Sequence, residues 1–274
     1  MFSPLCNGTL AAMPTNNTLQ KFYNCVYKKG ERTHYTQFRL QKGDMPEEFR
    51  AVLGLLPWEG KEVLDAGCGT GDMCALIAAA GAAHVTGIDY AESAITEAKK
   101  KYGETGAIFL QKSIDEMEGE FDAVISLGTL EHMDDPLRTL RHLKGLLKPG
   151  GSLIVTCPNW LNLRGYVLQT LWHLFRAPIT LADLHYLTPG DFEEWGKQLG
   201  MRLEWSTVDS DWGQGKKMVE DFKRRLPNVA RDAHMAVTQE QIDGFIRWLE
   251  QRALPFQKEE KQSGAVGVYH FRMI

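Results

Sequence analysis

The sequence predicts an α/β fold in which a mostly parallel sheet lies between two layers of helices. From Glu62 onward, short β-rich runs alternate with segments whose apolar residues recur at helical spacing, and this alternation is typical of repeated strand, helix, strand units. The 274 residues are 43% hydrophobic and 24% charged, as in a globular protein with a sizeable core. We therefore expect one decorated α/β domain and not a disordered, collagen-like or disulfide-stapled chain.

The helices and strands of the core are predicted from the spacing of apolar residues and from residues typical of helix ends. Two amphipathic helices are expected between the first three strands, one around Leu76 and one around Ile95. Asp135 and Pro136 are typical of a helix N-cap followed by a first turn, and the turn at 149–151 is expected to end that helix. The strands are assigned to residues 63–66, 84–89, 107–110, 123–127 and 152–157.

Three segments are expected to surround this core. Residues 1–57 are interpreted as a helical extension that caps the cofactor, and residues 58–211 as the core, with an insertion at 158–187. Residues 212–274 are interpreted as helices followed by a last strand that closes the sheet edge. The apolar side chains of the insertion cover most of a helix circumference, which indicates burial on more than one side. Three interpretations of the insertion remain open: a second core layer, a lid over an apolar substrate pocket, and a membrane-surface helix.

The charge balance and the cysteines indicate which partners and which compartment to expect. With 31 basic and 35 acidic residues, the net charge is -4. The chain thus has no excess of positive charge that would favour binding to nucleic acid. The five cysteines include no C-x-x-C pair, as expected in a reducing compartment. No export signal is recognised, and no apolar run approaches the roughly 18 residues of a membrane span. We expect a cytoplasmic protein with a small-molecule partner, no nucleic acid and no membrane span; the oligomeric state stays open.

A glycine-rich loop follows the first strand. Gly67, Gly69 and Gly71 alternate where the strand turns into a helix, so that a ligand can approach the backbone without meeting a Cβ. Asp89 ends the second strand, 18 residues beyond Gly71, where a carboxylate can accept both hydroxyls of a ribose. The two features together favour a nucleotide-like ligand over a purely structural turn.

The residues around the loop separate the possible cofactors. A dinucleotide fingerprint needs glycine at position 72, where this chain has Asp72, and an anion there would repel a pyrophosphate. Asp65, directly before the loop, suits a ligand with a positive end, such as the ammonium and sulfonium groups of S-adenosylmethionine. A P-loop is excluded because its Gly-Lys-Ser/Thr is absent.

From about residue 60 to 205 the chain resembles class I S-adenosylmethionine-dependent methyltransferases. The resemblance rests on the D-x-G-x-G-x-G loop, Asp89, the strand entry at 121–124, the motif Leu130-Glu131-His132, and the turn at 147–151. It implies a Rossmann-like three-layer sandwich with a seven-stranded sheet whose last strand is antiparallel.

The same resemblance implies the cofactor site. Where the family often has aspartate and a small residue, this chain has Ser113 and Ile114, and the serine oxygen can accept the adenine amine. The methionine portion is expected at the loop and at the end of the fourth strand, the ribose at Asp89, and the adenine against Tyr90. The remaining expected cofactor-binding residues are Asp65, Gly67, Cys68, Gly69, Ser126 and Leu127.

Within the superfamily, the chain looks nearest to the O-methyltransferases of ubiquinone biosynthesis and, more distantly, to small-RNA 2′-O-methyltransferases. Both groups carry E-x-x-E-H, whereas Gly128 replaces the first acid here. Glu131, His132 and His185 would leave a divalent ion one ligand short, so no metal is predicted. In the ubiquinone group an arginine ahead of the loop meets the cofactor carboxylate, and Arg39 is assigned to that role.

His132 is the predicted catalytic residue. It follows the fourth strand, and an imidazole, which titrates at about pH 6.5, suits the removal of a proton from a phenol or ammonium. We expect methyl transfer from S-adenosylmethionine to an oxygen or nitrogen of a small acceptor. Four aromatic residues of the insertion, Trp160, Tyr166, Trp172 and Tyr186, indicate an aromatic or lipid-like acceptor. An NAD-dependent oxidoreductase and a cofactor-binding protein without turnover are the alternatives.

Overall fold

A seven-stranded sheet forms the centre of the fold. The computed structural model describes residues 45–180 and 182–273, so Arg39 lies outside the described residues. The strand order is β3-β2-β1-β4-β5-β7-β6, and β7 is antiparallel to both β5 and β6 while the other pairs are parallel. The predicted fold class is thereby confirmed. The strands are β1 (Glu62–Ala66), β2 (His84–Asp89), β3 (Ile108–Gln111), β4 (Phe121–Leu127), β5 (Leu147–Pro158), β6 (Met201–Val208) and β7 (Val266–Met273).

The prediction that the last strand closes the sheet edge is wrong. β7 lies between β5 and β6, and β6 forms the edge. The burial pattern explains the order, because residues 267–271 of β7 are all buried, whereas the exposed residues of β6 alternate with buried or half-buried ones. A strand that is buried on both faces lies inside a sheet, and a strand with one exposed face tolerates the edge.

The turn at 149–151 also differs from its prediction. The helix before it ends at Gly145, and β5 already begins at Leu147. The pairing of β4 with β5 shifts register between Phe121 and Ala123, and Gly150 has a φ of 76°. The segment is therefore an irregularity within the longest strand and does not end the helix.

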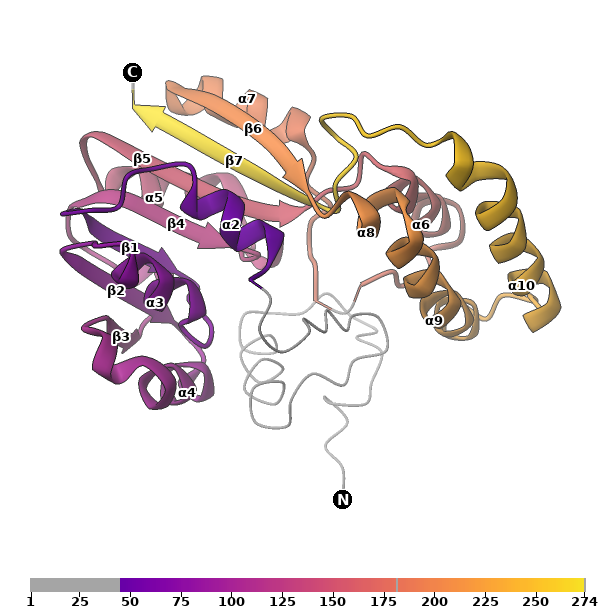
Figure 1. The fold of residues 1–274 in the computed structure, drawn as a ribbon, viewed down its shortest axis with the longest axis horizontal. Helices are drawn as coiled ribbons and strands as arrows, with labels where there is room; N and C mark the ends of the chain where they lie inside the picture. The colour runs from indigo at the N-terminus through magenta and orange to yellow at the C-terminus, as the bar shows by residue number, and fades with distance from the viewer. Residues whose placement is uncertain (1–44, 181, 274) are drawn as a thin grey trace.

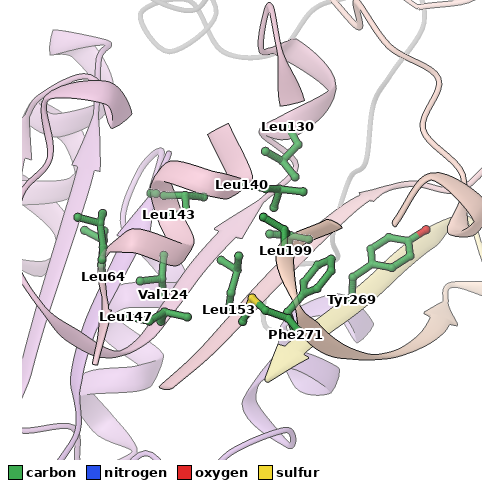
Figure 2. Packing of buried hydrophobic residues seen from close by; sticks show 14 of the residues in the cluster. Leu64, Val124, Leu130, Leu140, Leu143, Leu147, Leu153, Leu199, Tyr269 and Phe271 are labelled. Atoms are coloured by element: carbon green, nitrogen blue, oxygen red, sulfur yellow. The ribbon is translucent and has the colours of Figure 1, made fainter. Parts of the chain in front are cut away.

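Helices cover both faces of the sheet (Figure 1). On one face, α2 (Glu47–Leu53), α3 (Asp72–Ala79) and α4 (Glu92–Tyr102) pack around Val63, Ile125 and Ile154. On the other, α5 (Pro136–Gly145) and α7 (Pro189–Leu199) bury Leu140, Leu143 and Phe192 against the strands. Figure 2 shows this second cluster, in which helical leucines meet Val124, Leu153 and Phe271. The two clusters hold the strand ends, where ligands bind in such sheets, in fixed positions.

The insertion packs with the C-terminal helices. α6 (Leu163–Phe175), α8 (Ser210–Gln214), α9 (Lys216–Asp232) and α10 (Gln239–Trp248) lie together beside one end of the sheet (Figure 1). Leu168 of α6, Phe222 of α9 and Ile246 of α10 belong to one buried cluster. Asp221 of α9 pairs with Arg164 of α6 at 3.1 Å and with Arg225 at 2.8 Å. This packing favours the core-layer interpretation of the insertion, while the domain boundaries at 57 and 211 stay predictions.

In the described ranges, no helix combines the length and the apolar character that crossing a membrane requires.

Candidate functional site

The glycine loop between β1 and α3 is anchored to the end of β2. The backbone N–H groups of Gly67 and Cys68 both donate to the carbonyl of Ile88, at 2.8 and 2.9 Å. Gly67, Gly69 and Gly71 have φ values of 85°, 53° and 82°, which glycine adopts readily and other residues rarely. The backbone conformation by itself therefore accounts for the alternate glycines.

The atoms around the loop show which neighbour each of these glycines accommodates. A Cβ at Gly71 would lie 2.6 Å from the ring of Phe109, so this position serves the packing of α3 on the sheet and not the approach of a ligand. A Cβ at Gly67 would lie 2.5 Å from Oγ1 of Thr129, which follows β4. The expectation that all three glycines clear space for a ligand is thus wrong at Gly71 and at Gly67, because the space beside them is filled by Phe109 and Thr129.

Asp89 ends β2 and faces this loop. Its Oδ2 accepts the N–H of Gly69 at 3.0 Å, and its Oδ1 accepts the N–H of Ala91 at 2.8 Å. Burial raises the pKa of Asp89, while these two backbone hydrogen bonds lower it. Each carboxylate oxygen can accept a further hydrogen bond, as the predicted ribose contact requires. Tyr90, the expected adenine neighbour, comes next and is half-buried.

Asp65 lies beneath the loop and is 2% exposed. Its Oδ2 accepts a hydrogen bond from the Cys74 thiol at 3.2 Å. Burial raises the pKa of Asp65 to about 7, and the nearby charge of Asp89 adds to this rise. Two buried carboxyl groups thus lie close together, and a ligand with a positive end would reduce the cost of ionising them. Cys68, the loop residue between the first two glycines, is half-buried.

Asp72 is held at the first turn of α3 by two hydroxyl groups. Thr70 donates to Oδ2, and the Tyr102 phenol of α4 donates to Oδ1 at 2.7 Å. Asp72, the acidic residue that disfavours a pyrophosphate, is therefore held in place at the start of α3.

The end of β4 lies directly beside the loop. The Ser126 hydroxyl donates to the Ala66 carbonyl at 2.8 Å, and the Thr129 hydroxyl donates to the Leu127 carbonyl at 3.0 Å. Ser126 is completely buried, and its side chain joins β4 to β1.

Ser113 and Ile114 lie at a short turn after β3. The Ser113 N–H donates to Glu116 at 3.0 Å in a capping box, and the half-buried Ile114 packs against the core. The structure thus places these two residues at the carboxyl edge of the sheet, on the β3 side of Asp89.

His132 lies in the short helical turn Leu130–His132 after β4. Its Nδ1 is 3.0 Å from the carbonyl oxygen of Ala182, and Oδ1 of Asp183 is 3.7 Å from the same nitrogen. Because a carbonyl only accepts hydrogen bonds, we assign the proton to Nδ1, which leaves the lone pair on Nε2. The side chain is 13% exposed. The imidazole is thus oriented by the segment between α6 and α7, with Nε2 as its basic atom.

Glu131 adjoins this imidazole, with Oε1 3.9 Å from Nε2 of His132. The side chain is buried, and Oε2 has no hydrogen-bond partner. Burial raises the pKa of Glu131 to about 7; the charge of His132 opposes this rise and that of Asp183 supports it. Two carboxyl groups of perturbed pKa therefore flank His132, a pattern that is common at catalytic sites.

His185 lies beside the turn that carries Glu131 and His132, because its backbone N–H donates to the Glu131 carbonyl at 3.1 Å. Its Nε2 is 2.9 Å from the backbone carbonyl of Met133. Over residues 45–180 and 182–273, no group of three or more His, Cys, Asp or Glu side chains has a metal-binding arrangement.

Three of the four aromatic residues expected near the acceptor gather together. Tyr186 makes edge contacts with Trp160 and Trp172, at centroid distances of 5.1 and 5.4 Å. Tyr166, by contrast, is 57% exposed on α6. Tyr166 therefore lies on the solvent face of that helix.

Sequence reasoning missed Asp183 and Glu48. Asp183 approaches His132 from a segment about 50 positions away, and Glu48 of α2 accepts a hydrogen bond from Thr156 at the end of β5. Neither residue belongs to a motif, because their positions depend on packing between segments far apart in the sequence. The raised pKa of Glu48, caused first by burial, becomes evident only in the folded chain.

Comparison with known proteins identifies the family of the chain. A methyltransferase domain family matches residues 40–204. The ubiquinone biosynthesis O-methyltransferase of Pseudomonas aeruginosa is 30% identical over 155 residues, which are 53% of this chain and 66% of that protein. The match thus spans slightly less than two thirds of the relative's length.

Solved structures share the fold. The magnesium protoporphyrin IX methyltransferase of Synechocystis, crystallised with S-adenosylhomocysteine, is 23% identical with a TM-score of 0.56, over 71% of this chain and 94% of that one. The cyclase SpnF is 18% identical with a TM-score of 0.59, over 95% of this chain and 97% of that one. Proteins with different named activities thus share this architecture, so the choice of reaction depends on the site.

Proposed function

Because this chain belongs to the class I S-adenosylmethionine-dependent methyltransferases, we propose that it transfers a methyl group to a hydroxyl oxygen of a small aromatic acceptor. The observation that carries the proposal is the orientation of His132, whose Nδ1 faces the Ala182 carbonyl at 3.0 Å. The basic Nε2 is then the atom that can take a proton from a hydroxyl. The names of the relatives, which are O-methyltransferases, support oxygen as the acceptor atom.

The described residues fit S-adenosylmethionine. The loop at Gly67 lies against Thr129, at the end of β4, and Asp89 retains acceptor capacity for a ribose. Asp65 and Asp89 are buried carboxyl groups of raised pKa, which a cationic ligand would stabilise in their ionised forms. When bound, S-adenosylmethionine supplies a methyl carbon activated by its positively charged sulfur. Asp89 is proposed to hold the ribose, and the backbone at Leu127 the methionine portion.

His132 is proposed to deprotonate the acceptor. Nε2 would take the acceptor proton as the acceptor oxygen replaces sulfur on the methyl carbon that bound S-adenosylmethionine would supply. Asp183, 3.7 Å from Nδ1, stabilises the imidazolium that results. Because the sulfonium carbon is already activated, the other demands on the protein are alignment of the acceptor and exclusion of water.

A labelled-methyl assay tests this function. The protein is incubated with methyl-labelled S-adenosylmethionine and a panel of phenols, each paired with the aniline of the same skeleton. We expect transfer to phenols and little or none to anilines, and a large loss with the His132→Gln variant. Transfer to the anilines alone would identify nitrogen as the acceptor atom. If the cofactor binds but no acceptor in the panel or in a metabolite extract is methylated, the alternative of a cofactor-binding protein without turnover is favoured.

A further inference from the structure

The carboxylate of Glu48 lies at the carboxyl edge of the sheet, where β4 and β5 end. The Thr156 hydroxyl donates to Oε1 of Glu48 and also accepts the N–H of Gly128 at 3.1 Å. The same N–H donates to the Thr156 carbonyl at 3.1 Å. Glu48 is thereby connected to the residue that directly follows Leu127 and β4.

A continuous row of residues joins Glu48 to the glycine loop. Thr129 fills the space beside Gly67, where a Cβ would lie 2.5 Å from its Oγ1. Gly128 precedes Thr129 and binds Thr156, which binds Glu48. The row crosses β1, β4 and β5, which are neighbours in the sheet and together span about 10 Å. A methionine portion lying over Gly67 and the end of β4 is therefore flanked by Glu48.

The charges around Glu48 are negative. Asp209 raises the pKa of Glu48 further, after the larger effect of burial, while the hydrogen bond from Thr156 lowers it. Glu47, the preceding residue, is a second carboxylate and accepts the N–H of Asp209 at 2.8 Å. No lysine or arginine within the described ranges forms an ion pair with Glu48. A half-buried carboxylate without a basic partner favours the binding of a cation.

We propose that Glu48 binds the α-ammonium group in the methionine portion of S-adenosylmethionine and of its demethylated product. This ammonium is the cation that the row of residues brings within reach, because the ribose lies on the opposite side of the loop, at Asp89. The inference rests on the cofactor that the proposed function also uses, and it is independent of the acceptor and of His132.

Binding of three product analogues to the Glu48→Gln variant tests the inference. Glutamine retains an oxygen that can accept the Thr156 hydroxyl, but it removes the charge. S-adenosylhomocysteine carries the ammonium and the carboxylate, S-adenosyl-3-thiopropylamine carries the ammonium alone, and 5′-methylthioadenosine carries neither. We expect the variant to bind the first two about tenfold or more weakly, as for a lost charge-assisted hydrogen bond, and to bind 5′-methylthioadenosine within about twofold of the unaltered protein.

Two further variants separate charge from structure. Glu47→Gln alters a carboxylate on the same helix that is bound to Asp209, and we expect all three affinities to stay unchanged. Thr156→Val removes the hydroxyl and keeps the Glu48 charge, so S-adenosylhomocysteine affinity should fall less than with Glu48→Gln.

Two results would overturn the assignment. One is unaltered S-adenosylhomocysteine binding by Glu48→Gln, and the other is an equal loss of affinity for all three ligands, which would mean that the variant disturbs the whole site. Since no measurement requires an acceptor, failure of methyl transfer with the expected affinities would contradict the proposed function and leave this inference standing.

Discussion

Oδ2 of Asp89 accepts the backbone N–H of Gly69 at 3.0 Å, across 20 residues of sequence. This hydrogen bond ties the end of β2 to the glycine loop that follows β1. The shape of the loop and the position of the proposed ribose carboxylate therefore depend on each other. A substitution at Asp89 should affect both the binding of the cofactor and the stability of the fold.

Asp89→Ala should weaken binding of S-adenosylhomocysteine by tenfold or more, because each charge-assisted hydrogen bond to the ribose contributes about 1.5 to 3 kcal/mol. It should also lower the free energy of unfolding by about 1 to 3 kcal/mol, since two N–H groups lose their acceptor. Titration calorimetry and urea unfolding measure the two effects, with the exposed Asp115→Ala as control. The unaltered protein should not bind NAD. An unchanged titration curve for Asp89→Ala would remove Asp89 from the ribose site.

His132→Gln should lower turnover by about 10² to 10⁴, the range for a positioned base, and leave cofactor affinity within about twofold. Glutamine keeps the size and hydrogen bonding of the side chain but cannot accept the acceptor's proton as imidazole does. For a phenolic acceptor, raising the pH should restore part of the rate, because the phenol then ionises in solution. Weak cofactor binding would instead place His132 in the cofactor site, and normal turnover would make it structural.

Activity should survive treatment with EDTA. Gly128 stands where metal-dependent relatives of the predicted family carry a carboxylate, and the His185 ring faces the Met133 carbonyl at 2.9 Å. Turnover is measured before and after chelation and again after addition of magnesium. Complete loss with EDTA and recovery with magnesium would show that Glu131, His132 and His185 rearrange to bind an ion.

Asp65 should make the ligand-free protein less stable as the pH rises. Burial raises its pKa from 3.8 to about 7, so between these values the folded chain holds a proton that the unfolded chain releases, and stability falls with increasing pH. Asp65→Asn cannot ionise, so between pH 5 and pH 8 it should lose less stability than the unaltered protein, by up to about 3 kcal/mol. Urea unfolding at pH 5 and pH 8 measures the difference. Parallel pH profiles for both proteins would show that Asp65 titrates at its ordinary value.

Gly71→Ala should destabilise the fold by about 2 to 4 kcal/mol. The position has a φ of 82°, and a Cβ would lie 2.6 Å from the Phe109 ring. Gly106→Ala is the matched control, because it has the same φ of 82° with no atom within 4 Å, and it should cost only about 1 to 2 kcal/mol of backbone strain. Thermal or urea unfolding compares the two. Equal losses would mean that Phe109 moves aside freely.

The elements of the central sheet could be predicted from the sequence because their signals are local. The periodicity around Leu76 and Ile95 is the direct consequence of burying one face of a helix, and the loop at Gly67 needs conformations that glycine favours. Asp89 and His132 could be expected at one edge for the same reason, since one ends a strand, the other follows a strand, and such strand ends meet at one edge of a parallel sheet. The cofactor class followed from charges within a few residues of this loop.

Only the tertiary structure decided which distant segments meet. Val266–Met273 lies inside the sheet, where residues 267–271 are buried on both faces, and α6 packs with the C-terminal helices because their buried faces fit one another. The contacts of Asp183 with His132 and of Glu48 with Thr156 join segments about 50 and 108 positions apart. Such contacts leave no local pattern, because burial and hydrogen bonding across the fold depend on the arrangement of whole elements and not on the spacing of residues within one.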